Sequence, residues 1–188
     1  MNGEDKIQVF ENELALIKDD KVKQVVEQIV QELPEYFFRV AASSTGKYHP
    51  PMSLGEGGLV RHTKGAVAVA KDLMSLEMFQ PLKEHFDIII GALILHDGLK
   101  HGEVESQYTK AEHPKLMHDF ITSFTVDEDS KKDSILNRLA LGVLTHMGQW
   151  NTDYRTRKEL MPKPSTKVQN FIHLCDYLAS RKYISMEF

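Results

Sequence analysis

The sequence has little of what marks secreted or membrane-spanning proteins. Cys175 is the only cysteine among 188 residues, so no intramolecular disulfide can form, which argues against a secreted scaffold and fits a reducing compartment. The longest apolar run, residues 88–95, is too short to cross a bilayer. The first residues lack the basic and apolar regions of a signal peptide. We therefore expect a cytoplasmic protein with no membrane partner.

Basic residues are not in excess either. The formal net charge is -4 and the isoelectric point is about 6.1, so the chain lacks the broad basic surface expected of a protein that binds duplex nucleic acid. Hydrophobic residues make up 41% and charged residues 27%, close to the average of soluble globular proteins. An anionic ligand must therefore be met locally, by a few cations or by metal.

Apolar residues recur at helical spacing along most of the chain, and no segment alternates as a strand would. The pattern predicts a compact all-α bundle of about seven helices. Pro34 and Pro114 are placed to open helices, and Ser165 is the expected N-cap of the last helix. The expected helices cover residues 5–17, 21–33, 34–42, 59–74, 84–97, 113–124, 127–147 and 165–183.

The length suits a single domain with one core. We expect residues 1–42 to form N-terminal packing helices of that domain and residues 43–188 to form its functional core. Residues 43–58 and 148–164, rich in Gly, Ser or Pro, are expected loops. Residues 84–97 are nearly all apolar, which indicates a central helix buried on most sides.

Six residues of metal-ligating type fall at or near the ends and faces of these helices. The central helix ends in a His-Asp pair, although an apolar residue is expected there. Histidine and carboxylate side chains that converge from different helices are the ligand set of Zn, Mn, Fe or Co. Taken singly, each would be an ordinary capping or solvated side chain. The six candidates are His62, His96, Asp97, His113, His146 and Asp176.

The order of these residues resembles the HD-domain superfamily of metal-dependent phosphohydrolases. In that family a His is followed by a His-Asp doublet that closes a buried helix, and then by a distant Asp. The matching stretches are GGLVRHT at His62, LILHDGLK at the doublet His96 and Asp97, and LCDYLASR at Asp176. The resemblance covers roughly residues 43 to 182 and includes small stand-alone HD proteins and the HD domain of bacterial oligonucleotide 3′-exonucleases.

The resemblance implies a dinuclear site, because members with two metals add two histidines between the doublet and the last Asp. His113, in EHP, and His146, in LTHMGQW, stand in that order. Asp97 would then bridge two divalent transition-metal ions (Mn, Co, Zn or Fe), which activate water and clamp a phosphoryl oxygen. One departure is that many members read His-Asp-x-Gly-Lys, whereas this chain reads HDGLK, with Lys100 at the expected place.

Several cations are candidates for binding substrate phosphate. Lys100, one turn after the doublet, is expected to stabilise charge on the phosphoryl oxygens as a catalytic group beside Asp97. Arg155 and Arg157 follow His146 in a loop, and Lys47 lies in a Gly-containing loop. Trp150 could stack on a base, but core packing is the simpler expectation. We expect His49 and His101 to face solvent, with the loop of His49 close to the site.

Together these observations predict a phosphohydrolase acting on a nucleotide, a cyclic nucleotide or a short oligonucleotide. The nucleotide substrate is implied by the resemblance alone. Two other classes stay open. An HD-fold di-iron oxygenase would use the same ligands, and a non-catalytic nucleotide-binding sensor is favoured if the metals are lost or Lys100 is remote from the site. The oligomeric state has no signal in the sequence.

Overall fold

The chain folds as a bundle of helices, which confirms the predicted all-α class. The computed structural model describes residues 1–43, 46–47, 49–125 and 134–183, and within these ranges it contains eight α-helices and no β-strand. The α-helices are α1 (Gly3–Val9), α2 (Glu11–Leu14), α3 (Asp20–Glu32), α4 (Gly58–Leu73), α5 (Phe86–Leu95), α6 (His113–Thr122), α7 (Ile135–Leu144) and α8 (Lys167–Ala179). Short 3₁₀ segments cover Glu35–Phe38, Pro51–Ser53, Glu77–His85 and Gly148–Trp150.

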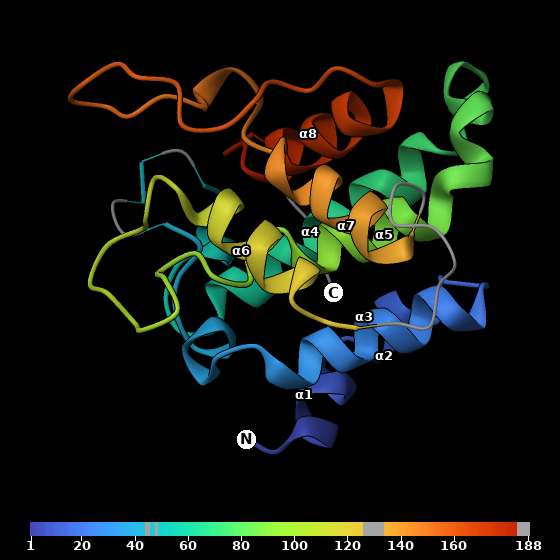
Figure 1. Ribbon diagram of the computed structural model, residues 1–188, viewed down its shortest axis with the longest axis horizontal. Coiled ribbons are helices and arrows are strands. Elements are labelled where there is room, and N and C mark those ends of the chain that lie inside the picture. Colours follow the sequence, from blue (N-terminus) through green and yellow to red (C-terminus); the bar gives the residue numbers. More distant parts are fainter. Residues whose placement is uncertain (44–45, 48, 126–133, 184–188) are drawn as a thin grey trace.

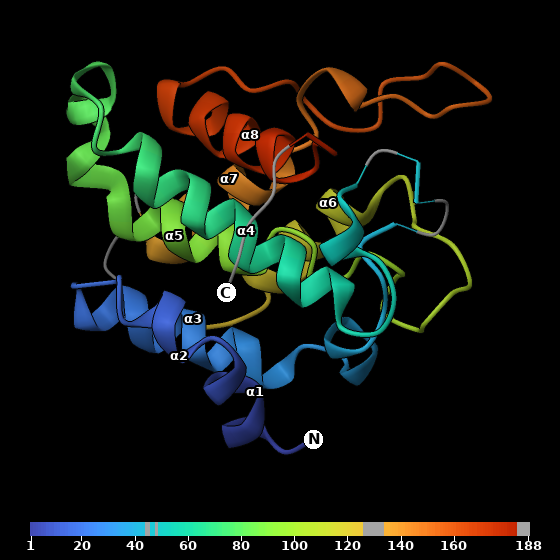
Figure 2. The same cartoon turned by 180° about the vertical axis from the view of Figure 1, so that it is seen from behind.

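Helix α5 forms the centre of the bundle, as its apolar composition predicts. Every residue from Ile88 to Leu95 is buried, and α5 contacts α3, α4, α7 and α8, which surround it in Figures 1 and 2. Gly91 permits a close approach of α3 and α7, because a Cβ atom there would lie 2.8 Å from both Val26 Cγ2 and Leu139 Cδ2. The tight packing around α5 fixes the position of the turn that follows it.

Some predicted boundaries differ from the observed ones. The predicted helix 5–17 is broken at Phe10 into α1 and α2, where the buried ring packs against Phe37 and Phe38. The predicted helix 34–42 contains only the 3₁₀ segment Glu35–Phe38. Helix α7 begins at Ile135, and the earlier part of the predicted helix 127–147 falls largely outside the described residues.

The N-cap of the last helix is Thr166 and not Ser165. The Thr166 side chain accepts a hydrogen bond from the Gln169 amide, and the Gln169 side chain accepts one from the Thr166 amide, which completes a capping box. Ser165 instead donates from its hydroxyl to the same Gln169 oxygen. Helix α8 therefore begins one or two residues later than predicted.

The N-terminal helices pack directly on the core. The Asp87 carboxylate, in the first turn of α5, accepts hydrogen bonds from the amides of Lys18 and Asp19. Lys6 on α1 is buried, and its ammonium donates to the carbonyls of Gln31, at 2.8 Å, and Leu33, at 2.6 Å. A cation at the end of α3 satisfies carbonyls that have no partner within the helix.

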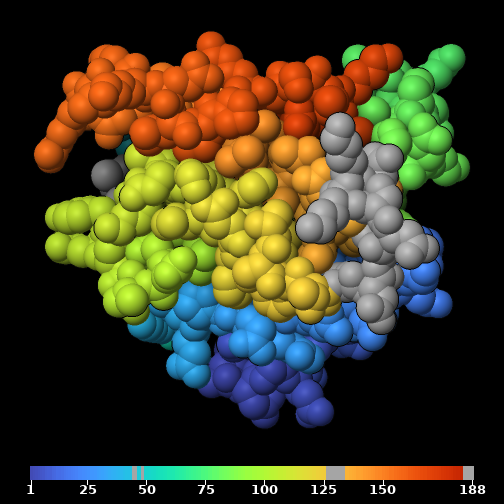
Figure 3. Space-filling model, in the orientation of Figure 1, coloured from blue at the N-terminus to red at the C-terminus, as the bar shows by residue number. Residues whose placement is uncertain are grey.

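Two long connections lie at one end of the bundle. The loop between α5 and α6 and the loop between α7 and α8 both extend to the same side in Figures 1 and 2. Figure 3 shows the C-terminal segment, in orange and red, across the top of the molecule, opposite the N-terminal helices. Among the described residues, none of the helices has the length and apolar character needed to cross a bilayer.

The buried ammonium of Lys6 should contribute measurably to stability. We expect Lys6→Met, which keeps the alkyl packing and removes both hydrogen bonds, to lower the free energy of unfolding by about 1–3 kcal/mol. Lys21→Met on the exposed start of α3 is the control, with an expected change within about 0.5 kcal/mol. Urea denaturation measures both, and equal midpoints for the two variants would contradict this role.

Candidate metal centre

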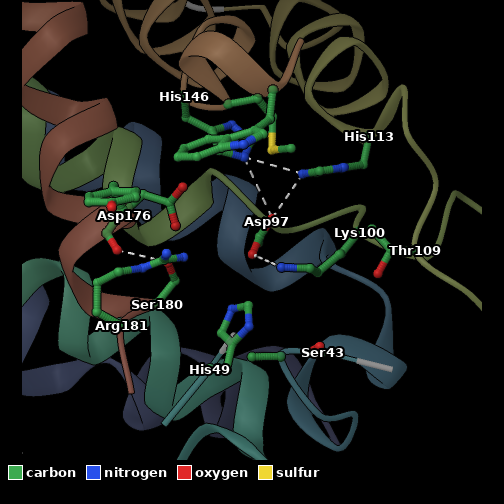
Figure 4. A pocket seen from close by; sticks show the side chains of 14 residues that line it. Ser43, His49, Asp97, Lys100, Thr109, His113, His146, Asp176, Ser180 and Arg181 are labelled. Carbon is green, nitrogen blue, oxygen red and sulfur yellow. Dashed lines mark hydrogen bonds and ion pairs between the residues drawn. The ribbon is translucent and has the colours of Figure 1, made fainter. Parts of the chain in front are cut away.

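All six predicted ligands come together in two neighbouring groups. Four of them, Asp97, His113, His146 and Asp176, are seen in Figure 4. The turn that follows α5 carries His96 and Asp97. His113 is the first residue of α6, and His146 follows the last residue of α7 by two positions. His62 on α4 and Asp176 on α8 complete the set.

His62, His96 and Asp176 form a compact group, which we call the first trio. His62 Nε2 lies 2.9 Å from Asp176 Oδ1 and 3.3 Å from His96 Nε2. His96 Nε2 lies 3.5 Å from the same Asp176 oxygen. Three ligand atoms at these separations can surround one metal ion.

The second trio consists of Asp97, His113 and His146. Asp97 Oδ1 lies 3.0 Å from His113 Nε2 and 3.7 Å from His146 Nε2. The two imidazole nitrogens are 3.2 Å apart. These atoms can likewise hold one ion.

Asp97 stands between the two trios and turns one oxygen to each. Its Oδ1 faces the second trio, whereas its Oδ2 lies 3.4 Å from His96 Nε2 and 3.8 Å from His62 Nε2. Its side chain is only 2% exposed. The geometry is that of a carboxylate able to bridge two ions.

In three histidines the hydrogen bond is made by Nδ1, which leaves Nε2 as the ring atom that can bind a metal ion. His96, His113 and His146 each donate from Nδ1 to the backbone carbonyl three residues earlier, at 2.6–2.7 Å. A carbonyl can only accept, so Nδ1 carries the proton and Nε2 of the neutral ring is an acceptor. This orientation of ligand histidines by an outer hydrogen bond is common at metal sites.

The second trio therefore places three acceptors face to face. Burial above all, and then the nearby His96 and His113, lowers the pKa of His146 to about 3. This ring is therefore neutral at neutral pH. Asp97 Oδ1 is buried and has no hydrogen-bond donor among the described residues. A cation between these atoms would satisfy all of them, which is the condition a metal site must meet.

The charges of the first trio suit a cation too. Burial opposes ionisation of Asp97 and Asp176, but Lys100 and His96 beside the first, and His62 and His96 beside the second, keep both carboxyl pKa values well below the usual range. Burial also opposes the charge of His96, yet Asp97 and Asp176 raise its pKa to about 10. A metal ion that binds here would displace that proton.

A cavity of about 370 Å³ opens onto both trios. Its volume is within the roughly 300–1,000 Å³ of small-molecule sites. Ligand residues of both trios form part of its wall, and Figure 4 shows them facing it. The lining residues outside the trios are Ala42, Ser43, His49, Lys100, Thr109, Met147, Trp150, Tyr177, Ser180 and Arg181.

The predicted substrate-binding cations are placed differently from one another. Lys100 lines the cavity, is buried, and holds its ammonium 2.5 Å from Asp97 Oδ2. Lys47, Arg155 and Arg157 are exposed and do not line the cavity. Arg157 lies over the ring of Tyr154 and has a φ of 59°. The structure thus brings only one of the four to the cavity.

Sequence reasoning missed several residues of this cavity. Arg181 and Ser180 follow Asp176 at the end of α8, and one helical turn beyond a ligand is the signal that could have found them. His49 was not missed entirely, because its loop is expected close to the site; it lines the cavity, with its ring 5.0 Å from that of His62. The expectation that His101 faces solvent is wrong, because it is 7% exposed and stacks on Tyr36.

His173 supports the second trio from outside. Its Nδ1 donates to the carbonyl of His146 at 2.7 Å. Gly148 makes room for this ring: its φ is 57°, and a Cβ atom there would overlap the His173 imidazole. Glycine is thus required on two counts, the left-handed backbone and the close approach.

Comparison with protein-family models, curated proteins and solved structures gives no match for this chain.

Gly148→Ala should destabilise the protein more than a left-handed backbone alone explains. We expect a loss of about 2–4 kcal/mol, from the unfavourable φ and from overpacking against His173. Gly55→Ala is the matched control, because Gly55 also has a positive φ, 71°, but nothing within 4 Å of the added Cβ. It should lose only about 1–2 kcal/mol. Thermal unfolding of both variants measures the difference, and equal losses would remove the His173 contact from the explanation.

Proposed function

We propose that this protein is a metal-dependent phosphohydrolase whose dinuclear site hydrolyses a phosphate ester of a nucleotide, a cyclic nucleotide or a short oligonucleotide. The observation that carries the proposal is the division of the Asp97 oxygens between two trios of ligands. The resemblance of the ligand order to the HD-domain superfamily supports the same reading. The proposed cofactors are two divalent transition-metal ions, of Mn, Co, Zn or Fe.

His62, His96 and Asp176 would hold one ion, His113 and His146 the other, and Asp97 both. A pair of such ions lowers the pKa of bound water and neutralises charge on phosphoryl oxygens. The side chains fix where this chemistry occurs, because the Nε2 atoms are aimed by the hydrogen bonds at Nδ1.

Lys100 would provide positive charge beside the proposed metal site. Its ammonium forms an ion pair with Asp97 Oδ2 at the cavity wall and thereby stabilises the buried carboxylate. It also presents positive charge to the space where a phosphoryl group would bind. A fixed cation in a partly buried site stabilises developing negative charge better than a solvated one does. Asp97 and Lys100 are accordingly the proposed catalytic pair.

The cavity favours a small substrate. Lys100 and Arg181 are the two Lys or Arg side chains among its described lining residues, which matches one to three phosphates better than a long strand bound through many contacts. The proposed metal ligands are mostly buried, so duplex nucleic acid would not reach them.

Asp97 is the residue whose loss should cost most. We expect Asp97→Asn, which keeps the shape of the side chain, and Asp97→Ala to abolish metal loading and phosphate release from adenosine monophosphate with added Mn. Elemental analysis of the purified protein and a phosphate assay measure the two effects, and circular dichroism checks the fold.

His118→Ala is the matched control, because His118 belongs to neither trio and contacts Asp119 instead. It should retain metal and activity. Wild-type metal content and rate in Asp97→Asn would refute the proposed site. An oxygen-dependent reaction of the iron-loaded protein without phosphatase activity would instead assign the oxygenase class.

The second trio should contribute one ion by itself. We expect His113→Ala and His146→Ala each to lower the metal stoichiometry from about two to about one and to slow turnover roughly 10-fold or more. Titration with Mn, followed by elemental analysis, gives the stoichiometry. A wild-type protein that holds a single ion at saturating Mn would make the site mononuclear.

A further inference from the structure

Three side chains at the cavity form a stack. The Trp150 indole lies parallel to the Tyr177 ring, with centroids 5.4 Å apart and an interplanar angle of 11°. The Arg181 guanidinium lies over the same tyrosine, 4.3 Å from its centroid. All three residues line the cavity, so the stack is one of its walls.

The outer member of the stack is open to a further ring. Tyr177 covers one face of the Trp150 indole, and His173 meets the indole at 57°. Trp150 nevertheless remains 46% exposed. A buried aromatic residue needs no ligand, but an exposed indole on a cavity wall is a surface on which a planar ring gains dispersion and stacking energy.

The stack is joined to the metal ligands through the backbone. Tyr177 directly follows Asp176, and the 3₁₀ segment Gly148–Trp150 begins two residues after His146. Both attachments are short and belong to packed elements. The indole is therefore held at a set position relative to both trios, as a specificity element must be.

Arg181 supplies the charge at this wall. Its guanidinium donates to Ser180 Oγ at 2.7 Å, and Figure 4 shows Arg181 at the cavity between Asp176 and His49. A guanidinium with several donors can bond a neighbour and a phosphate oxygen together. The exposed Arg155 and Arg157 do not line the cavity.

We propose that Trp150 is the base platform and Arg181 the phosphate anchor of a nucleotide-binding wall, so that the cavity takes a nucleoside phosphate and discriminates against a phosphorylated sugar without a base. The inference deepens the proposed function and rests on it for the reacting phosphate. Tyr177, between the two, positions both.

Trp150 is the only tryptophan in the chain, so its fluorescence reports ligand stacking directly. The probe is the phosphonate analogue of adenosine monophosphate, which resists hydrolysis, added to Mn-loaded protein. We expect it to quench the fluorescence. Adenosine and methylphosphonate, which each carry half of the probe, should bind at least roughly 10-fold more weakly.

Two variants should lose affinity for different parts of the ligand, and calorimetry measures the Kd values. Trp150→Ala should raise the Kd of the nucleotide phosphonate about 10-fold and leave that of methylphosphonate unchanged, whereas Trp150→Phe retains most of the affinity. Arg181→Met should weaken both phosphonates about 10-fold and leave adenosine unchanged. A general loss of structure would not separate the two halves of the ligand. Tyr154→Ala, which removes an 82% exposed aromatic outside the cavity, is the control.

An unchanged Kd in Trp150→Ala, or a loss of phosphonate affinity in Arg155→Met instead of Arg181→Met, would overturn the inference. Activity separates its failure from that of the proposed function. Equal kcat/KM for adenosine monophosphate and ribose 5-phosphate would remove the base platform and leave a phosphohydrolase. The expected binding pattern without hydrolysis would leave the nucleotide wall and remove the enzyme.

Discussion

The buried carboxylate of Asp97 is the constraint on which the rest of the site depends. An ionised carboxylate that is almost wholly buried is costly unless charges surround it. Lys100 meets one of its oxygens, and the histidines of two trios face both. The apolar helix α5 holds this group at the end of the core, and the other candidate ligands are arranged around it.

The fold was largely predictable because the spacing of apolar residues in the sequence indicates which faces of the helices are buried. The continuous apolar run of α5 and the helical faces of α3 and α4 each appear in the structure close to their predicted ranges. Local changes in the backbone that depend on residues far away in the sequence could not be predicted in this way. The break at Phe10 depends on contacts with Phe37 and Phe38, and no pattern within residues 5–17 reveals them.

The candidate site could be predicted in part, for a related reason. Ligand types at helix ends are visible in sequence, and the structure brings the six candidates together. Loop side chains have no such periodic signal. Arg155 and Arg157 lie near His146 in the chain but do not line the cavity, whereas Arg181 lines it from the end of α8. Proximity in sequence does not indicate which arginine lines the cavity, because a loop gives no direction to its side chains.

The first trio joins parts of the chain that are far apart. His62 and Asp176 are separated by 114 positions, and the trio is complete only when α8 has docked beside α4, with α5 in place. Contacts of such long range are costly in loop entropy and are expected late in folding. A polypeptide that is still emerging from the ribosome without α8 therefore has no complete first trio, and these three side chains come together only when the topology is finished.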